Sequence, residues 1–248
     1  MATDEVHVWH LLAEQVAAPN LLEVARGLLA DDERQRMNCF RQERDRLLFL
    51  LSRVLMRTVL ASYLGCDARE VRFGADDHGK PILHAGAPGV PPVARTSGSP
   101  LQFNLTHSRG AVALAVSGGC DVGVDIEERQ RSVEYLALAE RFFAPAEAAH
   151  LRALPVEHLP AAFFAVWTLK EAYVKGIGRG LSFPLDAFCF DLDVTRLLRF
   201  RPLADFVSPD WHFQQFELGE RHCGAVAVQN PGGGAINITL RDWREAFV

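Results

Sequence analysis

Two short stretches carry charged side chains at spacings that suit metal and phosphate chemistry. In the first, GVDIEE, Asp125 and Glu127 stand two residues apart, and on a strand such residues point to the same face. Two carboxylates on one face repel each other unless a cation or a proton lies between them. Mg²⁺ prefers a few carboxylates together with water and substrate phosphates. The pair is therefore a candidate for binding a metal ion, and a solvated strand end is the ordinary alternative.

The second stretch, WTLKEAYVKGIGRGLS, follows the apolar run AAFFAV. On a helix that begins near Ala161, Trp167, Glu171 and Lys175 lie along one face, so Glu171 is available as a third carboxylate. An ordinary Glu–Lys pair explains Glu171 with Lys175, but it does not explain the glycines that follow. These glycines free the backbone for close approach to a polyanion. They match neither a dinucleotide fingerprint nor a P-loop.

The elements that must position these residues form two similar halves of mixed helix and strand. Helical patterns cover residues 44–64, 132–153 and 160–176, and extended segments include GVDIEE, GAVALAVS and GAVAVQN. The last two runs share the letters GAVA within a similar order of elements, which favours two related halves over one continuous barrel. We expect an α+β fold (α/β mixed), with halves at residues 1–120 and 121–248 that join near 118–123.

Composition excludes several other classes. The formal charge of −5 argues against a general nucleic-acid binder. The five cysteines form no CxxC motif, so reduced thiols are expected. The start of the chain lacks the basic segment of a signal peptide, and no uninterrupted apolar run approaches the roughly 20 residues that span a bilayer. The sequence therefore predicts a soluble cytoplasmic protein that binds neither nucleic acid nor membrane.

Together, GVDIEE and WTLKEAYVKGIGRGLS resemble the paired signature of the 4′-phosphopantetheinyl transferases, in particular the larger, pseudo-duplicated Sfp type. Every fixed position of (V/I)G(V/I)D(I/V)E and W(S/T)xKE(A/S)xxKxxGxG is present. FNLTHS, HGKP and RFFAPAEAAHL are similar to further family segments, so the resemblance covers most of residues 30–190. It implies the transferase fold, in which the two halves are related by pseudo-two-fold symmetry. The N-terminal half would contact the 3′-phosphate of coenzyme A, the C-terminal half would carry the metal and catalytic residues, and the active site would lie at their interface.

The resemblance also implies a reaction. Such an enzyme transfers the 4′-phosphopantetheine arm of coenzyme A to a serine of an apo acyl or peptidyl carrier protein, needs Mg²⁺ and releases 3′,5′-ADP. Its partners would be coenzyme A and the carrier domains of fatty-acid, polyketide or peptide synthases, and two fused halves permit a monomer. A Mg²⁺-dependent nucleotide pyrophosphate hydrolase would share the metal residues without needing the paired motifs. A non-catalytic module that binds coenzyme A or a carrier would not need to keep the metal residues.

By resemblance, Asp125, Glu127 and Glu171 hold Mg²⁺ against the pyrophosphate. Glu171 is also the candidate base for the serine hydroxyl, either directly or through water. A carboxylate bound to a cation is a weak base, so the metal role of Glu171 has the better support. Lys175 would stabilise the charge that develops on the leaving phosphate, which makes Asp125, Glu171 and Lys175 the expected catalytic residues.

Contacts to coenzyme A are also expected from the resemblance. Thr106 and His107 match the positions at the 3′-phosphate, although a turn-capping histidine is the alternative for His107. Lys80, in HGKP, matches a phosphate-binding lysine. Lys170 is either a second phosphate contact or solvated.

Basic residues near the first long helix and after GVDIEE complete the expectations. Arg36 matches a basic contact in relatives, and the second basic position of some relatives is Glu33 here. Arg34 or Arg44 replaces that second contact, or the contact is absent, and a solvated helix face is the alternative. The segment 129–143 would face the carrier, whose acidic helix suits the basic residues Arg129, Arg131 and Arg141.

Overall fold

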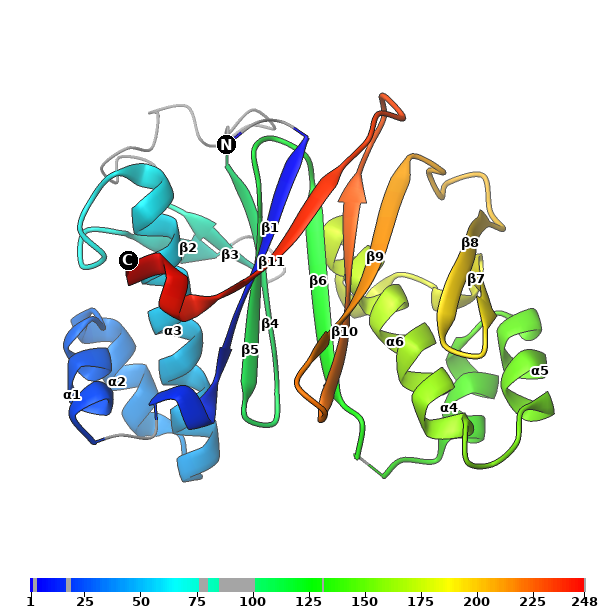
Figure 1. The fold of residues 1–248 in the computed structure, drawn as a ribbon, viewed down its shortest axis with the longest axis horizontal. Helices are drawn as coiled ribbons and strands as arrows, with labels where there is room; N and C mark the ends of the chain where they lie inside the picture. The colour runs from blue at the N-terminus through cyan, green and yellow to red at the C-terminus, as the bar shows by residue number, and fades with distance from the viewer. Residues whose placement is uncertain (2–3, 17–18, 76–79, 85–100, 131, 248) are drawn as a thin grey trace. The chain divides into compact units, whose positions relative to one another are not determined.

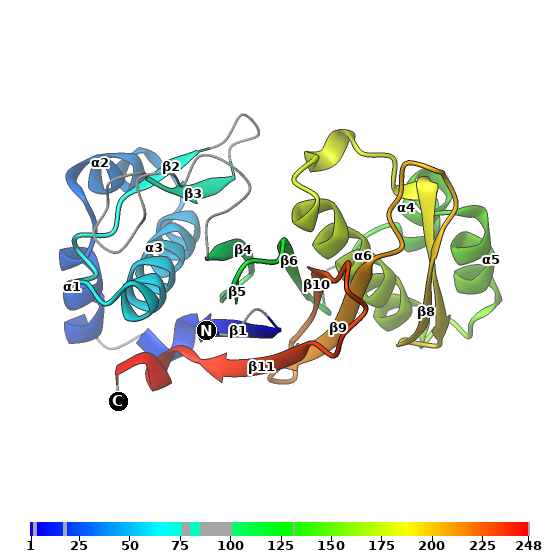
Figure 2. The same ribbon diagram turned by 90° about the horizontal axis from the view of Figure 1, so that it is seen from above.

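The computed structural model describes residues 1, 4–16, 19–75, 80–84, 101–130 and 132–247. The chain forms two compact units (Figure 1): unit 1 comprises residues 1–121 and 236–248, and unit 2 comprises residues 122–235. In each unit a long helix packs against a small sheet, as Figure 2 shows from a second direction. Helices and strands are mixed in both units, so the fold is α+β, as the sequence predicts.

Unit 1 begins with a strand, continues through helices and further strands, and ends in a short 3-10 helix (labelled η). Its four-stranded sheet has the order β11-β1-β5-β4, and β2 and β3 form a separate hairpin. The elements are β1 (Glu5–Leu12), η1 (Ala13–Val16), α1 (Pro19–Gly27), α2 (Asp31–Cys39), α3 (Glu43–Leu64), β2 (Phe73–Ala75), β3 (Pro81–Leu83), β4 (Gln102–Ser108), β5 (Ala111–Ser117), β11 (Asn237–Asp242) and η4 (Trp243–Phe247).

The core of unit 1 forms around α3. Its apolar residues recur at helical spacing, so that Leu51 and Leu55 are fully buried in the same cluster as Leu114 of β5. The helix ends at Gly65, whose φ of +66° is the left-handed conformation that glycine adopts without steric cost. By length and composition α3 could cross a membrane, but 61% of its apolar window is buried inside the protein. We therefore identify α3 as the core helix of unit 1.

Unit 2 has a three-stranded sheet of order β6-β10-β9, which α6 covers, and a separate β7–β8 hairpin. The predicted helix over 132–153 is in fact two helices. The residue before Pro145 is extended, as proline disfavours the helical region there. The elements are β6 (Val122–Glu128), α4 (Tyr135–Phe142), α5 (Pro145–Ala153), α6 (Leu159–Gly176), η2 (Gly180–Ser182), η3 (Leu185–Ala187), β7 (Phe188–Asp193), β8 (Arg196–Pro202), β9 (Trp211–Leu218) and β10 (His222–Gln229).

The two units share one order of elements. Each has a strand, a set of helices ending in the longest, a two-stranded hairpin, and two antiparallel strands of which the second lies in the middle of the sheet. The two GAVA runs fall at these matching central strands, β5 and β10. This shared topology supports two related halves.

The C-terminal segment departs from the predicted division. The change of unit after Asp121 lies within the expected segment 118–123, but residues 236–248 belong to unit 1 rather than to the second half. The reason is that β11 pairs in parallel with β1, with Val6 opposite Ile238. Pairing between the two ends of a chain leaves no local mark in the sequence.

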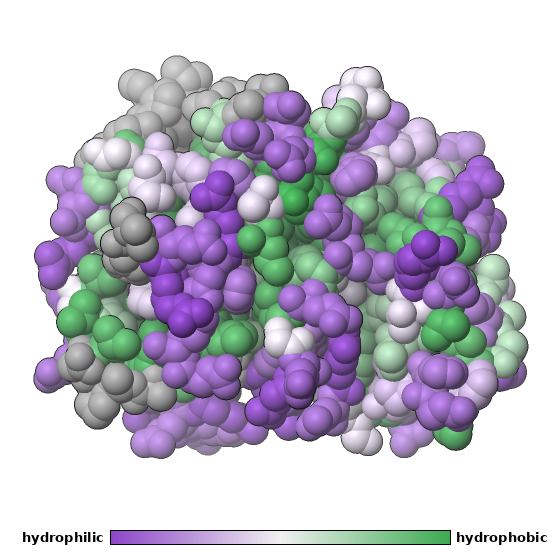
Figure 3. Space-filling model, in the orientation of Figure 1, coloured by the Kyte–Doolittle hydropathy of each residue, from purple (hydrophilic) through white to green (hydrophobic). Residues whose placement is uncertain are grey.

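The surface of unit 2 is of mixed polarity around the β7–β8 hairpin. Figure 3 shows apolar and polar side chains interspersed there. Leu198 of β8 is 58% exposed and Phe206 is 65% exposed. Single exposed apolar side chains are common on protein surfaces, so we assign them no function.

Candidate active site

Two glycines let α6 cross β6 at very short range. A Cβ atom on Gly123 would lie 2.0 Å from the carbonyl oxygen of Ala172 and 2.3 Å from the nitrogen of Gly176. A Cβ atom on Gly176 would lie 2.7 Å from the ring of Trp211. Only glycine fits such a close approach. The crossing places the last two turns of α6 beside the middle of β6, where Asp125 lies.

The glycines after Lys175 therefore have two different roles. Gly176 allows tight packing, which the sequence interpretation missed because its two neighbours there come from other elements. Gly178 and Gly180 have φ values of +67° and +62° and form the turn after α6, as expected of a glycine-rich loop.

Three carboxylates and one ammonium group gather at this crossing. Asp125 is 5% exposed and Glu171 is 8% exposed, whereas Glu127 is half-buried. Asp125 and Glu127 share one face of β6, because they are two residues apart on the strand. The Nζ atom of Lys175 lies 2.6 Å from Oδ1 of Asp125. The structure thus brings together four of the residues that the sequence singled out.

The electrostatics of the crossing centre on Glu171. Burial raises the pKa of its carboxyl group, the charges of Asp125 and Glu127 raise it further, and Lys175 partly offsets them. Like charges in a poorly solvated place disfavour full ionisation unless a cation joins them. The carboxylates are therefore close enough to repel one another.

The residues at the crossing fit a magnesium ion in their chemistry. Among the described residues, however, no three His, Cys, Asp or Glu side chains are arranged closely enough to hold a metal ion without moving. The cation beside Asp125 is instead the ammonium group of Lys175, which donates a hydrogen bond to it. The Oε1 atom of Glu171 is buried and has no hydrogen-bond partner in the described part of the chain. A buried carboxylate oxygen beside other carboxylates is the kind of hard ligand that Mg²⁺ accepts.

Lys170 requires a correction. The side chain is completely buried, and its Nζ atom lies 2.7 Å from Oε2 of Glu147. It donates hydrogen bonds to the carbonyl oxygens of Leu185 and Phe188, at 2.7 and 2.8 Å. Neither the phosphate contact nor the solvated side chain expected from the sequence describes these surroundings. The sequence could not show this, because Glu147 belongs to a different helix.

Apart from Lys170, the residues expected to contact coenzyme A belong to unit 1. Thr106 and His107 are neighbours on β4, so Thr106 is buried and His107 is exposed. Lys80 immediately precedes β3 and is half-buried. Two other residues of the HGKP turn, His78 and Gly79, lie outside the described residues, and Pro81 begins β3.

The arginines near α3 differ in their surroundings. Arg36 is exposed, with its guanidinium 5.9 Å from the centre of the Phe49 ring, and Arg44 is exposed beside Asp45 at 3.5 Å. Arg34 pairs with Asp31 at 2.7 Å.

The contacts of Glu33 show why this chain has an acidic residue where some relatives have a basic one. It is 5% exposed, and its carboxylate lies 2.9 Å from Arg57 and 3.5 Å from Arg53, both on α3. Glu33 therefore connects α2 to the core helix α3 and does not take the place of the basic phosphate contact.

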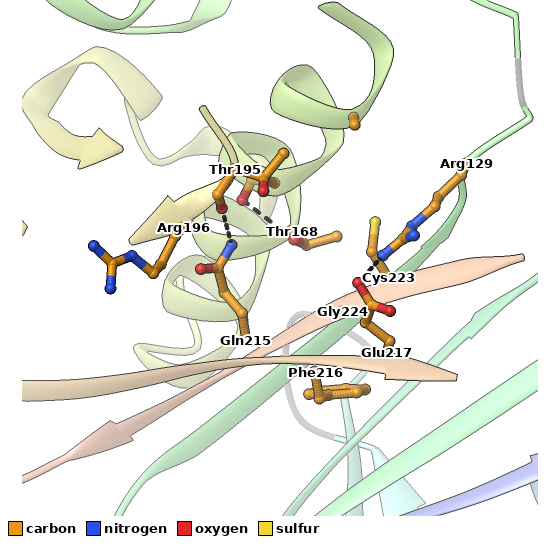
Figure 4. A pocket seen from close by; sticks show the side chains of 11 residues that line it. Arg129, Thr168, Thr195, Arg196, Gln215, Phe216, Glu217, Cys223 and Gly224 are labelled. Carbon is orange, nitrogen blue, oxygen red and sulfur yellow. Dashed lines mark hydrogen bonds and ion pairs between the residues drawn. The ribbon is translucent and has the colours of Figure 1, made fainter. Parts of the chain in front are cut away.

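A cleft of about 390 Å³ lies between α6, β9 and the β7–β8 turn (Figure 4). Gln215 fixes one wall, because it accepts a hydrogen bond from the nitrogen of Leu197 and donates one to the carbonyl of Thr195, both at 2.8 Å. The cleft is lined by Arg129, Ala161, Ala165, Thr168, Thr195, Arg196, Gln215, Phe216, Glu217, Cys223 and Gly224.

The basic residues expected to face a carrier are partly engaged within unit 2. Arg129, at one side of the cleft, pairs with Glu217 (Figure 4). Arg141 of α4 is exposed, and its guanidinium lies 5.0 Å from the centre of the Phe142 ring. Arg131 lies outside the described residues.

Comparison with known proteins identifies the class to which this fold and site belong. The family pattern described as the 4′-phosphopantetheinyl transferase superfamily matches residues 121–227. A second pattern, described as the N-terminal part of a 4′-phosphopantetheinyl transferase, matches residues 17–118. The chain belongs to the 4′-phosphopantetheinyl transferase family, and the protein is an enzyme of that type.

Two relatives that match over most of the chain agree with this assignment. The transferase HetI of Nostoc sp. is 35% identical over 94% of this chain and 91% of its own length. The transferase Sfp of Bacillus subtilis is 29% identical over 83% of this chain and 84% of its own length. A solved structure of the Thermotoga maritima holo-[acyl-carrier-protein] synthase matches with a TM-score of 0.34 and 22% identity, over 44% of this chain and 62% of that one.

Proposed function

We propose that this transferase, which moves phosphopantetheine from coenzyme A to carrier proteins, does so with Mg²⁺ held at the β6–α6 crossing and releases 3′,5′-ADP. The observation that carries the proposal is the gathering of Asp125, Glu127, Glu171 and Lys175 within unit 2. Phosphoryl transfer depends mainly on alignment and charge neutralisation, and these four side chains offer both.

The roles follow from the surroundings of each group. Asp125, Glu127 and Glu171 would hold the ion, which when bound supplies positive charge to the pyrophosphate oxygens. Lys175, already directed at Asp125, would stabilise the charge on the leaving phosphate. The serine oxygen forms a bond to the pantetheine-side phosphorus, the bond to the leaving phosphate breaks, and the serine proton passes to Glu171 directly or through water.

Unit 1 supplies the contacts to coenzyme A in this proposal. His107 is exposed on β4 and is therefore accessible to the 3′-phosphate, and Lys80, Arg36 and Arg44 add positive charge. Thr106 is buried, so its hydroxyl group has less access to a ligand than His107. Lys170 is omitted, since its ammonium group is engaged inside unit 2.

Intact-mass analysis of an apo carrier protein tests the proposed function. With coenzyme A, Mg²⁺ and this protein, the carrier should gain one phosphopantetheine, and 3′,5′-ADP should form in equal amount. A panel of acyl and peptidyl carriers without any mass gain would contradict the proposal. Formation of 3′,5′-ADP without a modified carrier would favour the hydrolase instead.

Replacing His107 by alanine should weaken the use of coenzyme A more than that of 3′-dephospho-coenzyme A. The reason is that a charge-assisted contact to the 3′-phosphate exists only with the first substrate. The measurement is kcat/KM for both substrates, with Arg109→Ala, at the next turn, as a control for general effects. Equal losses for both substrates would remove His107 from the phosphate site.

Mg²⁺ should raise the melting temperature of the protein and fail to do so in Asp125→Asn. An ion that binds only the folded state stabilises it by mass action, and the variant lacks one of the proposed ligands. Thermal unfolding with Mg²⁺ and with chelator measures this. An equal Mg²⁺ effect in the wild type and the variant would place the ion elsewhere.

A further inference from the structure

The buried ion pair between Glu147 and Lys170 has no part in the reaction described so far. The two side chains are 2% and 0% exposed, and their charged atoms lie 2.7 Å apart. The ammonium group also lies 4.3 Å from the centre of the Phe188 ring and 5.5 Å from that of Phe143. Aromatic rings thus surround the pair and keep it from water.

The pair joins four segments of unit 2. Glu147 of α5 accepts hydrogen bonds from the nitrogen atoms of Ala144, which precedes α5, and Phe190 in β7, at 2.9 and 2.8 Å. Lys170 of α6 donates to the carbonyls of Leu185 in η3 and Phe188 in β7. Through these bonds α5, α6, η3 and β7 are held in one arrangement.

This arrangement bears directly on the candidate active site. Lys170 precedes Glu171 in α6, and Lys175 lies one turn further on. The contact between Lys170 and Leu185 closes the loop that contains Gly178 and Gly180. The rotation of the last turns of α6 and the course of the loop after them are therefore fixed by the same ammonium group.

Stability alone does not require a charged pair at this place. Replacement of a buried ion pair by apolar side chains of similar volume is often neutral or stabilising. What the ions add is directional, because each must meet its several hydrogen-bond partners.

We propose that Glu147 and Lys170 are positioning residues of the transferase, which orient α6 so that Glu171 can hold the metal ion and accept the serine proton while Lys175 meets the leaving phosphate. This inference rests on the proposed function. It differs from a phosphate contact by Lys170, because it gives Glu147 the same importance and predicts no direct effect on the binding of coenzyme A.

The test compares Lys170→Met, Glu147→Gln and the double variant with an exposed pair in the same unit, Arg196 and Asp193. Misplacement of catalytic groups by about 1 Å can cost about 10²-fold in rate. Each single variant should therefore lose tenfold or more in kcat (roughly 10- to 100-fold), with an unchanged KM for coenzyme A. The double variant should be no worse than the poorer single variant, because the two residues act as a unit. The exposed pair, 3.9 Å apart and well over half exposed, should be replaceable by Met at Arg196 and Asn at Asp193 without effect.

Hydrogen–deuterium exchange supplies a readout that does not depend on activity. Peptides covering residues 176–190 should exchange faster in the variants of the buried pair, while peptides from α3 stay unchanged. If a single variant does not fold, the double variant is compared with the wild type instead, because it removes both charges and leaves no unpaired buried ion.

Two results would overturn the inference. A higher KM for coenzyme A in Lys170→Met but not in Glu147→Gln would indicate a phosphate contact. Wild-type kcat in folded variants would show that the pair is only structural. If the wild-type protein transfers nothing to any carrier, the proposed function fails, and the exchange result still decides whether the pair orders the loop.

Discussion

Replacing Glu171 by glutamine is expected to lower the rate of transfer by about 10²- to 10⁴-fold, the range found for the loss of a general acid or base. The carboxylate would be lost both as a metal ligand and as the candidate acceptor of the serine proton, whereas the shape of the side chain is kept. The affinity for coenzyme A should change much less, because its proposed 3′-phosphate contacts lie in unit 1. Turnover on an apo carrier and direct titration with coenzyme A measure the two effects.

The same variant should make the metal-free protein more stable at neutral pH. The pKa of Glu171 is raised above 4.5 by burial and then by the charges of Asp125 and Glu127. The folded state therefore keeps a proton that the unfolded chain has already released, and stability falls as pH rises from about 4.5 through the raised pKa. Glutamine never acquires this charge, so its melting temperature at pH 7 should exceed that of the wild type.

The exposed Glu220, in the turn between β9 and β10, provides the matched control. Glu220→Gln should alter neither turnover nor melting temperature. Near-normal turnover of Glu171→Gln would exclude Glu171 from the site, and a lower melting temperature without metal would contradict the repulsion between the three carboxylates.

Replacing Gly123 by alanine is expected to cost roughly 1–3 kcal/mol of unfolding free energy, or somewhat more. The new methyl group would lie 2.0 Å from the carbonyl oxygen of Ala172 and 2.3 Å from the nitrogen of Gly176. Both are backbone atoms and cannot rotate aside, so β6 and α6 must separate. Because Asp125 is on β6 and Lys175 is on α6, transfer should fall as well.

Denaturant unfolding and the carrier assay follow these two effects, with Gly232→Ala as the control. A Cβ atom on Gly232 meets nothing within 4 Å, so this variant should behave like the wild type. Wild-type stability in Gly123→Ala would show that the crossing is less tight than described. A destabilised variant with full turnover would show that the crossing is not needed to hold the site.

Much of the candidate site could be predicted from the sequence because its geometry is local. The alternation of a strand puts Asp125 and Glu127 on one face, and the helical repeat puts Glu171 and Lys175 on another. The helix around residues 44–64 and the helix that ends near Gly176 follow from the spacing of apolar residues and from the glycines behind them. These features depend only on residues a few positions apart.

The tertiary structure decided what depends on partners far away in the chain. Lys170 and Lys175 are both lysines and lie five residues apart in α6. Lys170 nevertheless pairs with Glu147 in the core, whereas Lys175 pairs with Asp125 at the crossing. Gly176 is required by Trp211 and Gly123, and β11 completes the sheet of unit 1 from the far end of the chain. The sequence by itself determined which residues are candidates for the chemistry, because residue type and local period suffice to select them. Their burial and their partners were decided by packing between distant segments.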